Sequence, residues 1–444
     1  MKKIIAIVLA VVLVSAGLGV GVLSAAECTD CDGTSDGGTL YPPTVYLTES
    51  FRAIVTGDYV AAGVAMRGVG SGNITLSLPA DATIVKAFLY WAIMSGSETP
   101  DPAFDDGNIN GNPITGTLIG TAGDPCWPAT HIHNYVADVT DYATDGTNEL
   151  MGFTYSDTNV YLEGASLVAI YTELGASAKT IIIYEGALTF VDEEQATTID
   201  GFVAATGASK TTYIVADGQA TVPSLNNKVY VDGNLIAEEV LKGDDPPADI
   251  WYWDTYTAVT TAYISNGDTD VEVSIESDTD DGSVDCLTWV AQVLSVPTEL
   301  ELEIDIKPWS YPNTINPKSG GVVPVAILGS DTLDVTQIDP ASIDVVFGPD
   351  SASPRHNIND PSVFDDHTED PWLYYDPTPL DPDSGDEVYY TCNEDDVIDL
   401  ALHFRQKDTG LTHSDTTATL SGSFAIGGVP YYFIASDSVR VLDK

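Results

Sequence analysis

Three stretches of the sequence decide the fold class: ATIVKAFLYW at residues 82–91, ASLVAIY at 165–171 and KTIIIY at 179–184. Each is rich in β-branched or aromatic residues and is bounded by Gly, Asp or Pro, which is the pattern of a β-strand. The nearest approach to a helical period, at residues 235–242, is too short to organise a helical domain. The sequence therefore predicts an all-β protein of tandem β-sandwich domains, of jelly-roll or immunoglobulin-like type.

The lengths between turn-rich segments predict how the domains divide. The region before Pro297 is longer than one usual sandwich, so we expect two packed β-sandwiches, at residues 47–175 and 176–298. An alternating stretch at 300–307 begins a third, C-terminal β-sandwich at 299–444, which carries an acidic insertion at 361–392. Residues 27–46 begin Gly-, Asp-, Ser- and Thr-rich, and we expect them to form a flexible N-terminal arm.

The first 26 residues indicate export. Lys2 and Lys3 precede an apolar run at 4–23, and Ser24-Ala25-Ala26 supplies small residues for cleavage, so residues 1–26 are predicted to be a signal peptide. An uncleaved helical anchor is the alternative, because about 20 apolar residues can just span a bilayer. Glycines within the run favour cleavage. We therefore expect an extracellular protein of the cell surface that contacts the membrane only through an uncleaved signal.

The charge of the chain limits its partners. It has 67 acidic and 16 basic residues, and its formal net charge is -51. Nucleic acid is excluded as a partner, because its phosphates require Lys and Arg. Self-repulsion of this size must be screened by salt or by bound divalent cations.

Five cysteines lie in the part of the chain predicted to be exported, where disulfides persist: Cys28, Cys31, Cys126, Cys286 and Cys392. Because the number is odd, one thiol is free or forms an intermolecular bridge. We predict a disulfide between Cys126 and Cys286 and leave the other three unassigned.

Two Asp-rich loops are candidate calcium sites, since hard cations select clustered oxygen ligands. One loop holds Asp278, Asp280, Asp281 and Asp285 on a tight Gly turn, and the other holds Asp101, Asp105 and Asp106. Solvated acidic loops bathed in salt remain the alternative for both.

Three further patterns have possible functions. Asn73 begins an Asn-Ile-Thr glycosylation sequon. His131 and His133 have a spacing compatible with zinc or copper on one strand face, although two surface histidines are the more usual outcome. Trp251 and Trp253 also share a face, where core packing is a commoner role than sugar stacking.

Signatures of catalysis are absent from the sequence. It contains no G-x-S-x-G elbow, no His-Glu-x-x-His and no phosphate-binding Gly loop. The many acidic residues supply chance pairs that carry no glycosidase signal. We therefore expect a protein that is not an enzyme.

Two parts of the chain resemble known families. The segments TGDYVAAGV at 56–64, FLYW at 88–91, PCW at 125–127, GASLV at 164–168 and DCLTWV at 285–290 resemble an uncharacterised β domain of archaeal, methanogen-type, cell-surface proteins. This resemblance implies a location and a β fold, with no known chemistry.

The second resemblance covers the C-terminal region. IDIKP at 304–308, NTINP at 313–317, VPVAIL at 323–328 and DLALHF at 399–404 are similar to a module of many secreted bacterial and archaeal proteins. That module usually carries a calcium-loop-like segment before its last motif. The resemblance implies candidate ligands at Asn393, Asp395, Asp396 and Asp399, although the first Asp and the Gly of the pattern are replaced here.

These observations together predict a secreted structural protein that serves as a self-assembling subunit of an extracellular filament or surface layer. Its partners would be copies of itself or other surface proteins, joined by β-strand contacts and calcium-like cations. Tyr41, Val45, Tyr46 and Leu47 are the candidate assembly residues, because this segment could extend the sheet edge of a neighbour. A non-catalytic adhesion or glycan-binding module is the alternative.

Overall fold

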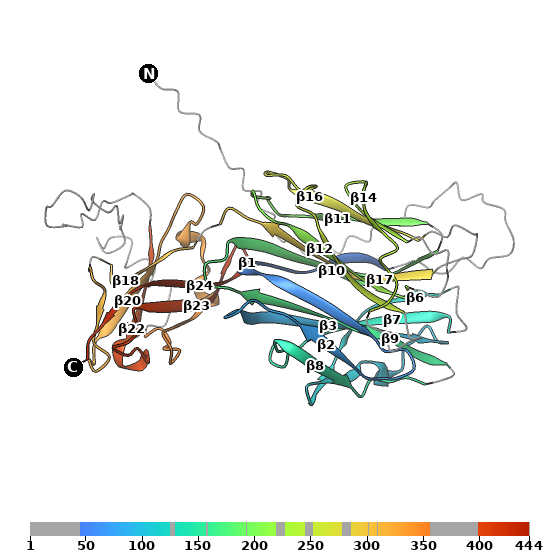
Figure 1. Ribbon diagram of the computed structural model, residues 1–444, viewed down its shortest axis with the longest axis horizontal. Helices are drawn as coiled ribbons and strands as arrows, with labels where there is room; N and C mark the ends of the chain where they lie inside the picture. The colour runs from blue at the N-terminus through green and yellow to red at the C-terminus, as the bar shows by residue number, and fades with distance from the viewer. Residues whose placement is uncertain are drawn as a thin grey trace, which may run out of the picture. The chain divides into compact units, whose positions relative to one another are not determined.

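The computed structural model describes residues 45–124, 129–156, 159–191, 193–218, 227–244, 252–277, 286–300, 302–308, 310–355 and 398–443. The chain divides into Met1–Leu40 and Tyr41–Lys444, and every described residue belongs to the second unit. Strands dominate it (Figure 1), and the described residues contain no α-helix. The predicted all-β class is confirmed. The described segments also contain no helix that is long and apolar enough to cross a membrane.

Two antiparallel sheets form the centre of the unit. The A sheet has the order β15 (Trp253–Val259), β12 (Lys210–Ala216), β17 (Cys286–Pro297), β10 (Ala178–Val191) and β1 (Val45–Ala65). The B sheet continues from β1 through β9 (Val160–Thr172), β3 (Thr83–Ser95) and β7 (His131–Asp138) to β6 (Thr117–Gly123). Strand β1 is thus common to both sheets.

Strand β1 changes partner halfway along its length. Residues up to Thr56 pair with β10, and residues from Gly57 onward pair with β9. A Cβ atom at Gly57 would lie 2.0 Å from the carbonyl oxygen of Tyr171. Because no side chain fits at that separation, glycine is required where the strand passes from one sheet to the other.

Each central sheet is covered by a smaller outer sheet. The C sheet has the order β2 (Gly72–Leu76), β8 (Gly146–Met151), β4 (Asp106–Ile109) and β5 (Asn112–Thr115), and the D sheet has the order β11 (Glu194–Asp200), β16 (Asp270–Glu276), β13 (Lys228–Val231) and β14 (Asn234–Glu238). One apolar core lies between B and C and includes Trp91 and Leu150. Another lies between A and D and includes Trp289 and Val273.

A third core joins the two sandwiches to each other. It contains residues from both central sheets, among them Tyr90 and Ile170 of the B sheet and Ile181 and Val293 of the A sheet. Since the A and B sheets are therefore covered on both faces, most residues of their inner strands β17, β10, β9 and β3 are buried. All 12 residues of β17 are buried, whereas the outer strand β11 exposes alternate residues.

The C-terminal region has its own core, which includes Ile306, Phe404 and Phe433. Its strands form three groups: β18 (Ile304–Ile306), β20 (Val322–Ile327) and β22 (Leu400–Arg405); β21 (Asp344–Phe347), β23 (Thr417–Ile426) and β24 (Val429–Ser438); and β19 (Thr314–Ile315) with β25 (Arg440–Val441). The described residues also include four 3-10 turns: η1 (Pro102–Phe104) in the B–C sandwich, and η2 (Val335–Gln337), η3 (Pro340–Ser342) and η5 (Gln406–Asp408) in the C-terminal region.

The C-terminal region is joined to the sandwiches by backbone pairing. Strand β24 runs parallel to β1, with Ile54 opposite Tyr431 and Val55 opposite Tyr432 (Figure 1). Gly175, the expected division between the first two sandwiches, lies in the turn between β9 and β10, where the chain passes from the B sheet to the A sheet. The sandwiches are nevertheless not separate in sequence, because β1 contributes to both.

Candidate functional site

Two polar clusters lie along β1, where the A and B sheets meet. The first, here called the Arg67 cluster, consists of Arg67, Glu163, Asp217 and Tyr252. The second, the Asp58 cluster, consists of Asp58, Tyr59, Lys179, Lys210 and Ser295.

In the Arg67 cluster one guanidinium connects the two sandwiches. Arg67 follows β1, and its Nε donates to Oε1 of Glu163 at 3.2 Å while its Nη2 donates to the second oxygen of that carboxylate. Nη2 also donates to Oδ1 of Asp217 at 3.2 Å. Glu163 belongs to β9 of the B sheet, and Asp217 directly follows β12 of the A sheet. The ring centre of Tyr252 lies 3.4 Å from the guanidinium carbon, which is a stacking contact.

Burial governs the electrostatics of this cluster. The Glu163 side chain is fully buried, and burial raises its pKa to about 7, against the opposing attraction of Arg67 and with a further increase from Asp124. Burial also opposes the charge of Arg67, but the carboxylates of Glu163 and Asp217 outweigh it and raise the pKa of Arg67. The guanidinium therefore stays charged, while Glu163 can gain a proton near neutral pH.

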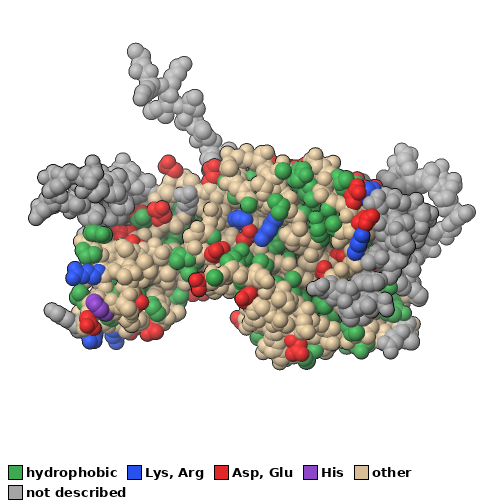
Figure 2. All heavy atoms as spheres, viewed as in Figure 1, with side chains coloured by type: hydrophobic (Ala, Val, Ile, Leu, Met, Phe, Trp, Pro, Cys, Tyr) green, Lys and Arg blue, Asp and Glu red, His purple; other side chains and the backbone are tan. Residues whose placement is uncertain are grey.

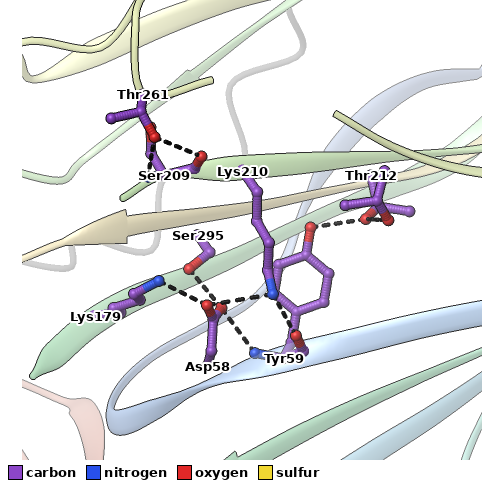
Figure 3. Close-up of polar contacts among 9 residues, drawn as sticks. Asp58, Tyr59, Lys179, Ser209, Lys210, Thr212, Thr261 and Ser295 are labelled. Atoms are coloured by element: carbon purple, nitrogen blue, oxygen red, sulfur yellow. Dashed lines mark hydrogen bonds and ion pairs between the residues drawn. The ribbon is translucent and has the colours of Figure 1, made fainter. Parts of the chain in front are cut away.

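The Asp58 cluster ties β1 to three other strands of the A sheet (Figure 3). Oδ2 of Asp58 accepts a 2.6 Å hydrogen bond from Nζ of Lys179 on β10 and lies 3.2 Å from Nζ of Lys210 on β12. Oδ1 accepts a 2.8 Å hydrogen bond from the Ser295 hydroxyl on β17. Asp58 is the second residue of the half of β1 that pairs with β9 of the B sheet. Its carboxylate therefore connects this half of the strand to three strands of the A sheet.

Tyr59 and Lys210 extend the cluster into the core. Nζ of Lys210 donates to the Tyr59 carbonyl oxygen at 2.6 Å and lies 4.5 Å from the centre of the Tyr59 ring. The Tyr59 hydroxyl shares a 2.7 Å hydrogen bond with the Thr212 hydroxyl (Figure 3). Burial lowers the pKa of Lys210 despite the attraction of Asp58, and burial raises the pKa of Tyr59.

Both clusters hold strands together. Their charged groups are largely buried and form ion pairs and hydrogen bonds with one another. These bonds join residues separated by up to 237 positions in the sequence. A buried polar network of this kind fixes one arrangement of the strands, since leaving any member without its partner is costly.

In the acidic loop around η1, two of the three candidate calcium ligands accept hydrogen bonds from groups close in the sequence. Asp101 caps η1 by accepting from the Ala103 amide at 2.9 Å, and Asp106 accepts from the Thr115 hydroxyl at 3.4 Å. Asp105 is the C-cap residue of η1, and calcium binding by these three aspartates stays a prediction. Among the residues that the structure describes, no group of three His, Cys, Asp or Glu side chains is placed to hold a metal ion.

Most of the other candidate calcium ligands lie outside the described residues, namely Asp278, Asp280, Asp281, Asp285, Asn393, Asp395 and Asp396. Asp399 is described. It is buried, and its Oδ1 accepts a 2.8 Å hydrogen bond from the Gly329 amide. Calcium binding by the loop before Asp399 stays a prediction.

The motifs of the C-terminal region place further carboxylates near Asp399. Asp305, in the IDIKP motif, is buried, and its pKa is raised to about 7 by burial and by the carboxylates of Asp437 and Asp399. Asn313, in the NTINP motif, donates to Asp437 at 2.9 Å. These motif residues therefore contribute to the packing of β18 against β24.

The structure describes one cysteine of the predicted disulfide and the predicted glycosylation sequon. Cys286 begins β17, is buried and is disulfide-bonded. Its pairing with Cys126 stays a prediction, because Cys126 lies outside the described residues. Asn73 lies on β2 at the edge of the C sheet and is exposed, as is Thr75 of the same sequon.

The candidate assembly residues have different roles. Tyr41 lies outside the described residues, whereas Val45 is the first residue of β1 and pairs with Ala187 of the same chain. Leu47 is buried in the core between the A and D sheets, and Tyr46 is 69% exposed. The chain therefore uses Val45 and Leu47 in its own sheet, and a role of this segment in assembly stays a prediction.

The histidine and tryptophan patterns also have structural roles. His133 is buried, and its ring nitrogens share hydrogen bonds with the hydroxyls of Ser95 at 3.0 Å and Thr121 at 2.9 Å. It is therefore not the surface residue expected. Trp253 is fully buried and donates to the Ser166 hydroxyl at 2.7 Å, as core packing requires, while Trp251 lies outside the described residues.

The comparisons with known proteins show no family. No family model and no curated protein matches the chain. The structure of PNGF-II is 8% identical over 58% of this chain and 66% of that chain, with a TM-score of 0.22. The T=1 particles derived from infectious bursal virus are 12% identical over 60% of this chain and 72% of that chain, with a TM-score of 0.18.

A third likeness is to the Spr0440 glycoside hydrolase domain of Endo-D from Streptococcus pneumoniae R6. It is 12% identical over 61% of this chain and 34% of that chain, with a TM-score of 0.15. TM-scores this low carry no argument about function. The class that the fold itself defines is an all-β protein of packed antiparallel sandwiches.

Proposed function

We propose that this chain is a secreted structural protein of the cell surface and a subunit that assembles with copies of itself. The observation that carries the proposal is β1, a single strand that pairs with β10, β9 and β24. Backbone hydrogen bonds therefore join the two sandwiches to each other and to the C-terminal region. In a modular binding protein, flexible linkers would connect such parts. A mechanical force applied along the chain would be resisted by these paired strands and by the buried ion pairs.

The segment before β1 is the proposed means of assembly. Residues 27–44 directly precede a strand whose first part is exposed at Tyr46, Thr48 and Glu49. An extended segment in this place can add to the sheet of a neighbouring copy through main-chain hydrogen bonds. The acidic surface fits a role for calcium-like cations in screening repulsion between copies. Figure 2 shows acidic side chains scattered over the visible face rather than gathered in one patch.

Electron microscopy of secreted material tests the proposal. The full chain should form ordered filaments or sheets in calcium, and deletion of residues 27–44 should leave monomers with an unchanged circular dichroism spectrum. Isolated monomers of the full chain at high concentration and in calcium would contradict it. Thermal unfolding in calcium and in chelator, at equal ionic strength, tests the cations separately, and identical midpoints would exclude them.

A second candidate is a non-catalytic adhesion or glycan-binding module, which one feature favours. A cleft of about 1000 Å³ lies where the sandwiches meet the C-terminal region, and its lining includes Thr56, Leu174, Glu299 and Ile304. This volume is within the range of ligand sites in proteins. A glycan array distinguishes the two proposals: binding that is lost on replacing Leu174 by Asp would favour this role, and a blank array from protein that still assembles would exclude it.

A further inference from the structure

Strand β24 has a free edge where it separates from β1. Pairing between the two strands ends at Val55 and Tyr432. Beyond it, the hydroxyl of Thr56 accepts a 3.1 Å hydrogen bond from the amide of Ile434, so this N–H points away from β23, the other neighbour of β24. Because backbone groups alternate in direction along a strand of an antiparallel pair, the N–H and C=O of Ser436 point the same way as those of Ile434.

This free edge opens into the cleft of about 1000 Å³ where the sandwiches meet the C-terminal region. Ser436 is exposed and lines the cleft together with the turn at residues 174–178. Among the described residues, none hydrogen-bonds to the N–H or C=O of Ser436 from the side of β1. Unused backbone groups at a sheet edge, placed in a concave site, are the features that an added β-strand recognises.

The chemistry of the cleft favours an uncharged, extended occupant. Its described lining includes the carboxylates of Glu299 and Glu303 and no basic side chain, so an acidic strand would be repelled. In the segment before β1, residues 27–36 carry four acidic side chains, whereas residues 39–44, TLYPPT, carry no charge. The two prolines also favour an extended backbone in the residues that precede them. Residues 39–44 are therefore the part of this segment that fits the cleft.

The length of β1 decides which copy of the chain supplies the occupant. Strand β1 pairs with Ala187 at Val45 and with Ala178 at Thr56, so about 35 Å of strand separates its start from the cleft. A segment as short as residues 39–44 spans at most about 20 Å. These residues therefore cannot reach the cleft of their own chain, but they can reach the cleft of a neighbour that lies end to end with it.

We propose that the cleft beside β24 accepts residues 39–44 of a second copy of this chain as an added strand. Each copy then donates at one end of its A sheet and accepts at the other, and such head-to-tail contacts build a filament unless their rotation closes a ring. The acceptor site rests on the proposed self-assembly and adds the place at which the segment of a neighbour is received.

Photo-crosslinking of the full chain tests the acceptor site. The photo-reactive amino acid p-benzoylphenylalanine at position 174, in the cleft lining, should capture the peptide that contains residues 39–44. In filaments grown from a mixture of isotope-labelled and unlabelled chains, crosslinked pairs of mixed isotope should appear, because the captured peptide comes from another copy. The control is the same amino acid at position 235 on β14, since Leu235 is 44% exposed and Leu174 is 48% exposed. It should not capture this peptide.

Two substitutions at Ser436 separate the backbone contact from the side chain. Ser436→Pro removes the N–H that faces the cleft and should abolish the filaments seen by light scattering and electron microscopy. Ser436→Ala keeps this N–H and should assemble like the unmodified chain. Equal thermal midpoints of the two variants would show that the loss of filaments is not caused by unfolding. If Ser436→Pro does not fold, the crosslink from position 174 still tests the acceptor site.

The outcomes distinguish the acceptor site from self-assembly itself. Filaments in which position 174 does not capture residues 39–44, or captures them only in pairs of like isotope, would overturn the acceptor site and leave self-assembly standing. Filaments formed by a folded Ser436→Pro variant would do the same. Isolated monomers of the unmodified chain, at high concentration and in calcium, would overturn both.

Discussion

Nζ of Lys179 on β10 donates a 2.6 Å hydrogen bond to the carboxylate of Asp58 on β1, 121 residues earlier in the chain. The same carboxylate lies 3.2 Å from Nζ of Lys210. Two of the few basic residues in a very acidic protein therefore converge on one aspartate. The bond lies close to Gly57, where β1 passes from the A sheet to the B sheet.

Replacing Asp58 by Ala should destabilise the fold strongly. The substitution leaves two partly buried ammonium groups without their shared carboxylate, and we expect a loss of about 2–4 kcal/mol in the free energy of unfolding. Chemical denaturation measures it. The control is Lys86→Ala, which breaks the pair of Lys86 with Asp138, where both side chains are about a third to a half exposed; such pairs contribute about 0–1 kcal/mol. Equal losses in the two variants would show that the Asp58 cluster is not structurally special.

Replacing Gly57 by Ala should disturb β1 at its change of partner. The added Cβ would lie 2.0 Å from the Tyr171 carbonyl oxygen, so the backbone of β1 or β9 must move. We expect a loss of about 1–3 kcal/mol, the usual cost of overpacking. Gly96→Ala is the matched control, because a Cβ there meets nothing within 4 Å. A thermal midpoint for Gly57→Ala as high as that of Gly96→Ala would contradict the need for glycine.

The strands could be predicted from the sequence, but their partners could not. Apolar runs such as ASLVAIY at 165–171 fall within β9, because a sheet covered on both faces favours apolar residues at most positions. The double role of β1 has no local pattern, since its residues pair with partners 99 to 142 positions away in the sequence. For the same reason the sequence predicts a flexible arm at residues 45–46, where the structure has the first residues of β1.

The candidate site was predicted less well than the fold. A search for local patterns finds Asp-rich loops, in which ligands are close in sequence. Arg67 meets Glu163 and Asp217 across 96 and 150 residues, so no motif could reveal the cluster. One signal was available: with only 16 Lys and Arg residues against 67 acids, a basic residue beside an apolar strand is a candidate for a buried ion pair.

Two adjacent residues at the start of β1 should behave in opposite ways. Leu47→Ala removes a buried side chain from the core between the A and D sheets and should lower the free energy of unfolding by about 2–4 kcal/mol. Tyr46→Ser changes a side chain that is 69% exposed and should leave stability within about 0.5 kcal/mol. If residues near 45 contact a neighbouring copy, Tyr46→Ser should also reduce assembly, as light scattering would measure. A large loss of stability in Tyr46→Ser would contradict the placement of β1.

His133 should make the protein sensitive to acid. Its pKa is lowered to about 4 by burial, below the ordinary value of 6.5, so between these values the unfolded state binds more protons than the folded state. The stability that this residue contributes is present above pH 6.5 and is lost as the pH falls through 4, by up to about 3 kcal/mol. In His133→Gln, the decrease in the free energy of unfolding between pH 6.5 and pH 4 should be smaller than in the unmodified chain. His131→Gln, at a partly exposed position of the same strand, is the control, and an equal decrease in all three proteins would exclude His133 as the cause.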